Sequence, residues 1–231
     1  LVHLVARALR LAPAERAVLL LCAPLGNTSF LGYPLTAALL GRDALPYAVA
    51  YDQFGSFILL TTWGFWVLAR YGGGEPLSAR ALLRRLLRFP PFPALLFALT
   101  LMPANPPPVV ASLLDQLAGA LLPVVAFALG LQLRLRLPRT VRAPLAAGLL
   151  LKLVVLPALA LLLVRPLGLA PLPAAAAVLE SAMPPMVTAA ALASLHRLAP
   201  ELAAALAGFG VLVSLLTLPL WGLLLGPGPL F

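Results

Sequence analysis

Charged and amide side chains lie inside long apolar segments of this 231-residue sequence. Asp52, Lys152 and Glu180 each fall within a run of mostly apolar residues, and the pair Asn27-Thr28 does so nearer the N-terminus. A charged side chain at the centre of a membrane helix costs about 2.5 to 3.5 kcal/mol, so it faces a cavity or a partner. Groups of this kind can bind an ionic ligand, hold a coupling proton or cation, or link two helices.

The sequence leaves the roles of these charges open. Lys152 and Glu180 fit an internal ion pair that holds adjacent helices in register as well as they fit direct contact with a ligand. Asp115 lies near the end of an apolar segment and is interpreted as an interfacial residue. His3 and His196 lie at segment ends beside arginines, without metal-ligand spacing, and are interpreted as solvated. The sequence predicts no metal site and no cofactor.

The composition is that of a protein that lies in a lipid bilayer. Of the residues, 62% are hydrophobic and only 10% are charged, and the mean hydropathy is +1.05. A soluble domain has about a quarter of its residues charged. The net charge of +9 is typical of nucleic-acid binding, but the basic residues are confined to short gaps between apolar segments, which excludes that class. The single cysteine, Cys22, excludes an intrachain disulfide.

Crossing a hydrocarbon core of about 30 Å takes about 20 mostly apolar residues. On this criterion the sequence predicts a partial helix at 1–11 and seven complete spans. The complete spans are predicted at 16–40, 45–69, 90–103, 109–133, 143–165, 172–195 and 202–225. The segment SARALLRRLLR at 78–88 is amphipathic and is predicted to lie on the membrane surface.

The placement of arginines orients these spans. When the gaps between spans are assigned alternately to the two sides, 13 arginines fall on one side, and only Arg42 and Arg165 fall on the other. Cytoplasmic loops collect Lys and Arg. The sequence therefore predicts a multi-pass protein of the cell (inner or plasma) membrane, with arginine-rich loops in the cytoplasm and the C-terminus outside.

Two of the predicted spans contain helix breakers beside polar residues. One is LCAPLGNTSFLGYP at 21–34, and the other is LESAMPPM at 179–186, five spans later. An odd offset places the two segments in opposite directions through the membrane. Paired interruptions of this kind indicate an inverted-repeat transporter with a site near the bilayer midplane. The N-termini of the half-helices would direct positive dipole ends to the centre, which favours a carboxylate ligand.

Several motifs resemble one known family. GNTSFLGYP at 26–34, followed by YAVAYDQFGSFIL at 47–59, resembles the signature of the auxin efflux carrier family, the bacterial relatives of the plant PIN-formed carriers. The run at 180–221, which begins ESAMPPMVTAAALASL, is similar to the last two helices of that family, and ALGLQLRLR at 128–136 fits its seventh helix. The resemblance extends over essentially the whole chain.

The resemblance implies an all-α integral membrane protein with a PIN-like fold, related to the bile-acid sodium symporters. Such a fold has ten helices in two inverted five-helix repeats, and its fourth and ninth helices break and cross where the substrate binds. On this basis 1–69 would be the end of helix 3 with helices 4 and 5, 70–89 a cytoplasmic basic linker, and 90–231 helices 6–10. Seven full spans and one partial span would then be present of an expected ten, with helices 1, 2 and most of 3 absent from this sequence.

The resemblance also implies site residues. Gly26, Asn27 and Thr28 would form the first crossing segment and Pro184 and Pro185 the second, and these five are the candidate substrate-binding residues. The candidates for charge balance or proton coupling are Asp52, Lys152 and Glu180. The candidate hinges are Gly32, Pro34 and Pro184.

The sequence thus favours a secondary carrier that moves a small organic anion, a dicarboxylate or an auxin-like acid, by alternating access. Coupling to a proton or to sodium is open, and the family resemblance favours a homodimer in the lipid bilayer, with no nucleic-acid partner. One alternative is an intramembrane enzyme that uses Asp52 and Glu180 as an acid/base pair, which requires both carboxylates near one substrate bond. Another is a membrane subunit or fragment that transports nothing.

Overall fold

Helices make up the secondary structure of the described residues, apart from one isolated antiparallel bridge between Gly26 and Pro185. The computed structural model describes residues 1–73, 80, 84, 87–88, 90–103, 105–132 and 137–225. Most of the predicted linker at 70–89, with the predicted surface segment in it, lies outside these residues.

The first part of the chain folds into short helices and one long helix. The short helices are α1 (Val2–Ala8), α2 (Pro13–Cys22), the π-helical turn η1 (Thr28–Gly32), α3 (Tyr33–Leu40) and the 3₁₀ turn η2 (Arg42–Ala44). The long helix runs from 45 to 71 and consists of α4 (Leu45–Tyr51), η3 (Asp52–Ser56), α5 (Phe57–Leu59), η4 (Leu60–Gly64) and α6 (Phe65–Tyr71). Its π-helical turns η3 and η4 are of a kind that often occurs at functional sites.

The second part contains longer helices. They are α8 (Pro91–Thr100), α9 (Pro108–Gln132), α10 (Arg139–Leu150) with the π-helical turn η5 (Leu151–Val155) and α11 (Leu156–Val164), then α12 (Pro171–Ser181), α13 (Val187–Leu195) and α14 (Pro200–Leu225). Proline occupies the first position of several of these helices, where its missing N–H costs nothing and its fixed φ favours the helical turn.

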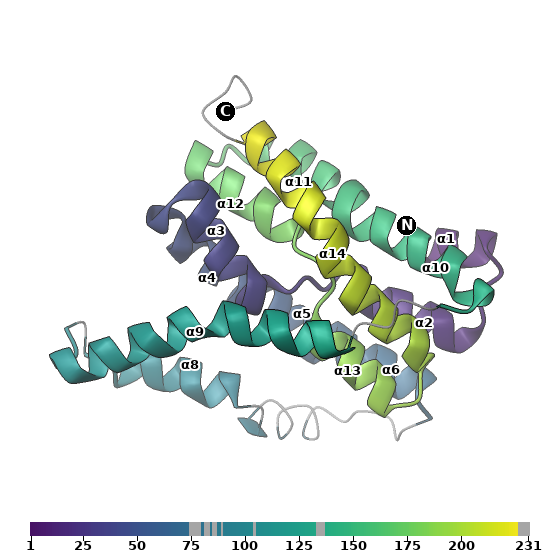
Figure 1. Cartoon of the computed structure of the whole chain (residues 1–231), viewed down its shortest axis with the longest axis horizontal. Coiled ribbons are helices and arrows are strands. Elements are labelled where there is room, and N and C mark those ends of the chain that lie inside the picture. The colour runs from purple at the N-terminus through teal and green to yellow at the C-terminus, as the bar shows by residue number, and fades with distance from the viewer. Residues whose placement is uncertain are drawn as a thin grey trace.

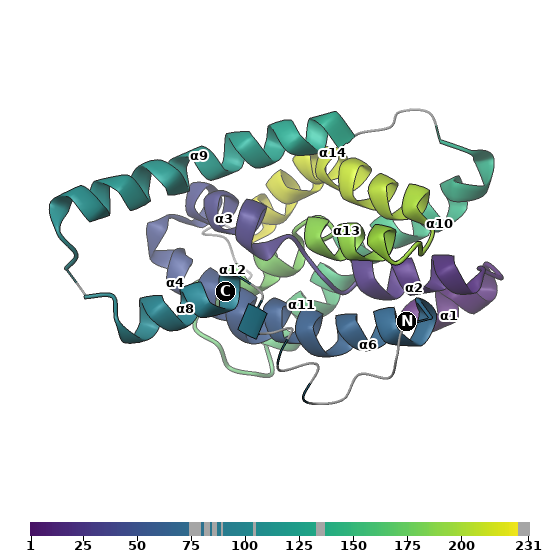
Figure 2. The ribbon, with the colours of Figure 1, turned by 90° about the horizontal axis from the view of Figure 1, so that it is seen from below.

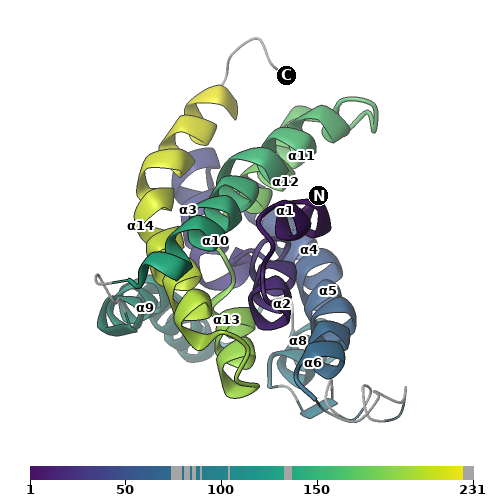
Figure 3. The same ribbon diagram turned by 90° about the vertical axis from the view of Figure 1, so that its right-hand side faces the viewer.

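The broken helices cross near the centre of the molecule. In Figure 1 the connection from α2 to α3 and the connection from α12 to α13 both pass through this region. Helix α14 extends past both pairs and packs against α2, α3, α12 and α13 (Figures 1 and 3). Helix α9 runs along one edge of the molecule, where it packs on η1 and α14 (Figure 2). The long helices α9 and α14 therefore both contact the short helices that form the crossing.

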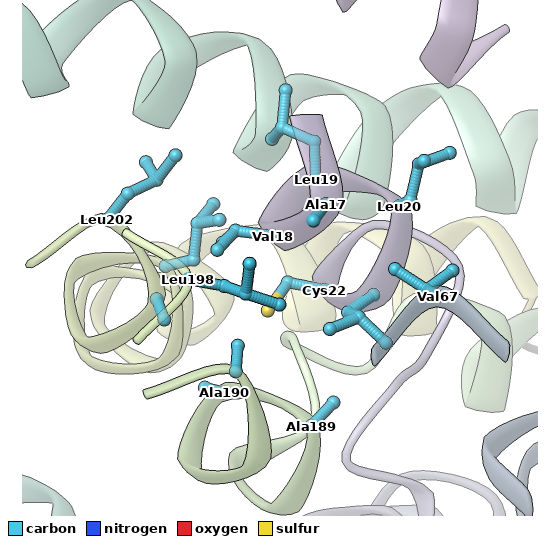
Figure 4. Close-up of a cluster of buried hydrophobic side chains, with 14 of the residues drawn as sticks. Ala17, Val18, Leu19, Leu20, Cys22, Val67, Ala189, Ala190, Leu198 and Leu202 are labelled. Carbon is cyan, nitrogen blue, oxygen red and sulfur yellow. The ribbon is translucent and has the colours of Figure 1, made fainter. Parts of the chain in front are cut away.

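The larger hydrophobic cluster surrounds α2. Figure 4 shows Val18 and Cys22 of α2 close to Ala189 and Ala190 of α13, with Val67 of α6 and Leu202 of α14 nearby. Side chains of α10 belong to the same cluster. The small alanines allow α13 to approach α2 closely, as small residues do in membrane helix packing. A second cluster packs α12 against α11, α14 and the flank of α3. Each half of each broken helix thus has its own apolar support.

Large apolar side chains also cover the outside of the molecule. On α14, Leu216 is 72% exposed and Leu223 is 81% exposed, and similar leucines are found on α9 and α11. Among the described residues, Arg139–Val164 and Pro200–Leu225 are long and apolar enough to cross a membrane, and Thr28–Leu40 and Pro108–Leu121 are apolar but shorter. The prediction of seven spans stays a prediction, because only these two described helices meet the criterion of length and hydropathy.

Gly210 of α14 offers a test of this packing. A Cβ atom at Gly210 would lie 2.5 Å from Cδ of Pro185 and 3.5 Å from Cβ of Pro184. Because the proline ring is rigid, we expect Gly210→Ala to lower the free energy of unfolding by about 1 to 3 kcal/mol, although alanine favours the helix itself. Circular dichroism in detergent during denaturant titration measures the change.

Gly119→Ala is the matched control, because a Cβ atom at Gly119 in α9 would meet nothing within 4 Å. This control is expected to be neutral or stabilising by up to about 1 kcal/mol. Equal effects of the two substitutions would contradict the close approach of α14 to the second break.

Candidate functional site at the helix crossing

The two predicted interruptions lie against each other. Residues 23–27 and 182–186 are not helical, and Gly26 pairs with Pro185 as an antiparallel bridge. The Asn27 N–H donates to the Pro184 carbonyl oxygen at 2.8 Å, and the Met186 N–H donates to the Leu25 carbonyl oxygen at 2.9 Å. Prolines at both breaks remove N–H donors that a continuous helix would use. Each break therefore supplies backbone partners that the other lacks.

Four half-helix ends meet at this crossing. Helices α2 and α12 end there with Cys22 and Ser181, and η1 and α13 begin there with Thr28 and Val187. The first N–H groups of a helix have no acceptor within that helix, and the N-terminus carries a partial positive charge. The crossing therefore presents two groups of N–H donors to a ligand.

Lys152 lies beside the crossing in the π-helical turn η5. Its Nζ donates to the Ser181 carbonyl oxygen at 2.9 Å, at the C-terminal end of α12, where a cation is favoured by the helix dipole. A Cβ atom at Gly26 would lie 3.0 Å from this Nζ. Glycine at position 26 thus leaves room for the ammonium group against the first break.

Glu180, near the C-terminal end of α12, has no exposed surface. Its Oε1 accepts a hydrogen bond from the Thr36 hydroxyl at 2.8 Å. Its carboxylate also lies against Gly32, where a Cβ atom would come within 2.8 Å of Oε1 and still closer to Oε2. Glu180 therefore ties α12 to η1 and α3 on the far side of the first break.

Asp52 is the centre of a dense hydrogen-bond network. Its Oδ1 accepts from the hydroxyls of Thr28 and Ser29, the latter at 3.0 Å. Its Oδ2 accepts from the Tyr33 hydroxyl at 2.7 Å and from Nε2 of Gln53 at 2.8 Å. Asp52 is 3% exposed, so these four donors replace the water that the carboxylate would otherwise bind. The network fixes the long helix against η1.

A cavity of about 150 Å³ lies beside the crossing. Its polar lining residues are Asn27, Ser29, Asp52, Gln53 and Thr188. Its aromatic and apolar lining residues are Phe30, Tyr33, Phe57, Leu60 and Met186. The amide nitrogen Nδ2 of Asn27 is buried without a hydrogen-bond partner, as is Oε2 of Glu180. A mostly apolar cavity with a few polar groups is the usual form of a small-molecule site.

The structure places most of the predicted site residues at the crossing. Gly26, Asn27, Thr28, Pro184 and Pro185 form it, and Asp52, Lys152 and Glu180 surround it. Pro34 lies in the first turn of α3, and the non-helical part of this segment lies earlier, at 23–27. Glu180 is not among the residues that line the cavity beside Asp52.

The remaining predicted positions are peripheral. Asp115 and His3 are exposed, and His196 is half-buried near Gly72. Within the described part of the chain, no cluster of three His, Cys, Asp or Glu side chains is suited to a metal ion.

Sequence reasoning missed the partners of the charged residues. Ser29, Tyr33 and Gln53 complete the Asp52 network, and Thr36 supports Glu180. The available signal was the number of hydroxyl groups within the apolar segment 28–36. Their common direction was not readable, because the π-helical turn η1 changes the spacing of residues that share a face.

The comparison with known proteins agrees with this geometry. Residues 1–222 match the family described as "Membrane transport protein". The chain belongs to this family. It is the auxin efflux carrier family that the motifs at the two breaks resemble, so the predicted family is confirmed.

Two archaeal relatives support the membership of this membrane transport protein. An "Uncharacterized transporter" of Methanothermobacter thermautotrophicus is 32% identical over 210 residues, which cover 90% of this chain and 67% of the relative. A similarly named protein of Methanocaldococcus jannaschii is 28% identical over 215 residues, which cover 90% of this chain and 68% of the relative. The family and both relatives indicate transport rather than catalysis.

The hydrogen bond between Thr36 and Glu180 yields a prediction for this transport protein. Thr36→Val keeps the shape of the side chain but removes the donor, so the buried carboxylate loses the partner on Oε1. We expect the free energy of unfolding to fall by about 1 to 3 kcal/mol, the usual cost of leaving a buried polar group without its hydrogen bond. Chemical denaturation in detergent measures it.

Thr62→Val is the matched control. The Thr62 hydroxyl is exposed and donates only to the Ile58 carbonyl oxygen of its own helix. Its loss is expected to change stability by no more than about 0.5 kcal/mol. If Thr36→Val were as mild as Thr62→Val, Glu180 would not depend on this contact.

Proposed function

We propose that this membrane transport protein is a secondary carrier of small organic anions that works by alternating access. The substrate carboxylate binds at the crossing of the two broken helices. Asn27 and Thr28 of the first break, and the start of α13 after Pro184-Pro185, contact it. Irregular backbone at membrane depth is tolerated only where protein or a water-filled cavity satisfies it, and in carriers such segments form the substrate site.

The observation that carries this proposal is the amide of Asn27. Asn27 is 2% exposed and lines the cavity, yet its Nδ2 has no hydrogen-bond partner. A buried donor without an acceptor costs about 1 to 3 kcal/mol, so a ligand that supplies an acceptor recovers this free energy on binding. A carboxylate oxygen is such an acceptor, and the N-terminus of α13 favours the same charge.

The buried charges have separate proposed roles. Lys152 and Glu180 balance the charge of the crossing and hold α12 against the first break, and Asp52 accompanies the substrate or takes part in coupling. Coupling to a proton or to a sodium ion is compatible with this arrangement. Gly32, Pro34 and Pro184 are the proposed hinge positions around which the half-helices reorient.

The wider architecture is part of the same proposal. Residues 1–69 and 90–231 belong to two inverted repeats joined by the basic segment 70–89, the arginine-rich loops face the cytoplasm, and the C-terminus lies outside. The carrier acts as a homodimer in the cell membrane. The many exposed leucines of α9, α11 and α14 support a lipid-facing surface.

Flux measurements test the carboxylate site. The full chain is reconstituted in proteoliposomes, and uptake of radiolabelled malate, indole-3-acetate and valine is followed over time. Asn27→Ala is expected to lower the rate for every transported carboxylate by about tenfold or more, because a hydrogen bond to a charged group is lost.

Asn105→Ala is the control, since Asn105 is exposed between α8 and α9. It is expected to leave the rate unchanged. Unchanged flux in Asn27→Ala, or equal loss in both variants, would contradict the assignment of the substrate to the crossing.

A further inference from the structure

The cavity beside the crossing already contains a negative charge. Asp52 lines it, and the two oxygens of Asp52 accept four hydrogen bonds, from Thr28, Ser29, Tyr33 and Gln53. Four donors match the lone pairs of an ionised carboxylate. None of the described lining residues carries a positive charge. A dicarboxylate in this cavity would therefore meet an unbalanced negative charge.

The surroundings of Asp52 suit an organic cation. Phe30, Tyr33 and Phe57 line the same cavity, and aromatic faces attract ammonium groups. The hydroxyl groups of Ser29 and Tyr33 donate to Asp52. The Tyr33 oxygen also accepts from Gln53 Nε2, and each hydroxyl oxygen keeps a lone pair that can accept from an ammonium group. A bare metal ion would instead need several oxygen ligands around it. Half of the lining side chains are aromatic or apolar, and among these only Tyr33 carries an oxygen atom.

A different part of the lining suits a carboxylate. The unpartnered Nδ2 of Asn27 and the first turn of α13, represented by Thr188, belong to the crossing. Asp52 and Phe57 belong to the long helix that packs beside it. The cavity thus combines donors for an anion on one element with a carboxylate and aromatic rings for a cation on another.

We propose that the substrate is a small zwitterion, an amino acid whose carboxylate binds at Asn27 and α13 and whose ammonium group binds between Asp52 and the aromatic rings. The proposal rests on the carboxylate site proposed above and adds the second charge. The cavity volume of about 150 Å³ is enough for a molecule of the size of benzene, so an amino acid with a short side chain fits.

A matched series of ligands tests the two charges separately. Valine carries both groups, isovalerate lacks the ammonium group, isobutylamine lacks the carboxylate, and succinate carries two carboxylates. Binding of each to the purified full chain is measured by isothermal titration calorimetry at neutral pH, in sodium buffer and in buffer where N-methylglucamine replaces sodium. We expect valine to bind at least about tenfold more tightly than the other three ligands, with or without sodium.

Variants assign each charge to a residue. Asp52→Asn is expected to weaken valine binding by about thirtyfold and to leave isovalerate binding equal or stronger, since the ammonium group loses its counter-charge. Asp43→Asn removes an exposed carboxylate of the η2 turn and is expected to change neither. If Asp52→Asn does not fold, Phe30→Leu tests the aromatic part, with a loss of about fivefold for valine only.

The remaining outcomes overturn the inference in distinguishable ways. If succinate or isovalerate binds more tightly than valine and Asn27→Ala abolishes that binding, the zwitterion is wrong while the carboxylate site stands. If isovalerate binds only with sodium and valine has no advantage, the cation beside Asp52 is a metal ion. If isobutylamine binds as well as valine, or no carboxylate in the series binds, the carboxylate site fails as well.

Discussion

The pairing of two unwound backbone segments is the constraint on which the rest of this structure depends. Inside a bilayer each unsatisfied N–H or C=O costs several kcal/mol, so a helix cannot simply stop there. Here the break at 23–27 and the break at 182–186 exchange hydrogen bonds through Asn27 and Met186. Because each break needs the other, the four half-helices must meet at one point, and α14 must come close enough at Gly210 to cover it.

This meeting point also determines where charges can lie. The C-terminal end of α12 accepts the ammonium group of Lys152 through the Ser181 carbonyl oxygen, and the N-terminal end of η1 lies beside the carboxylate of Asp52. Lys152 and Asp52 thus each lie at the helix end whose dipole favours their charge. The glycines at 26 and 32 leave space for Lys152 and Glu180 against the broken helix. The crossing is therefore a polar centre assembled from apolar helices.

The same arrangement combines continuous helices with broken ones. The long helices α9, α10–α11 and α14 run without a non-helical segment, whereas the crossing is joined by two backbone hydrogen bonds and a set of side-chain contacts. The two halves of each broken helix pack in different apolar clusters, with α2 and α13 in one cluster and α3 and α12 in the other. That combination would suit the alternating access proposed above.

The sequence by itself determined that the protein lies in lipid, which family it belongs to, where the two helices break and which charged residues are buried. Hydropathy, proline placement and rare charges are properties of the chain alone. Asn27, Thr28, Asp52, Lys152 and Glu180 were all identifiable in this way. Only the tertiary structure decided which groups these residues contact. Ser29, Tyr33, Gln53 and Thr36 became partners through a π-helical turn and through helices distant in sequence. Distances across a crossing depend on how the helices pack, and a linear pattern does not record that.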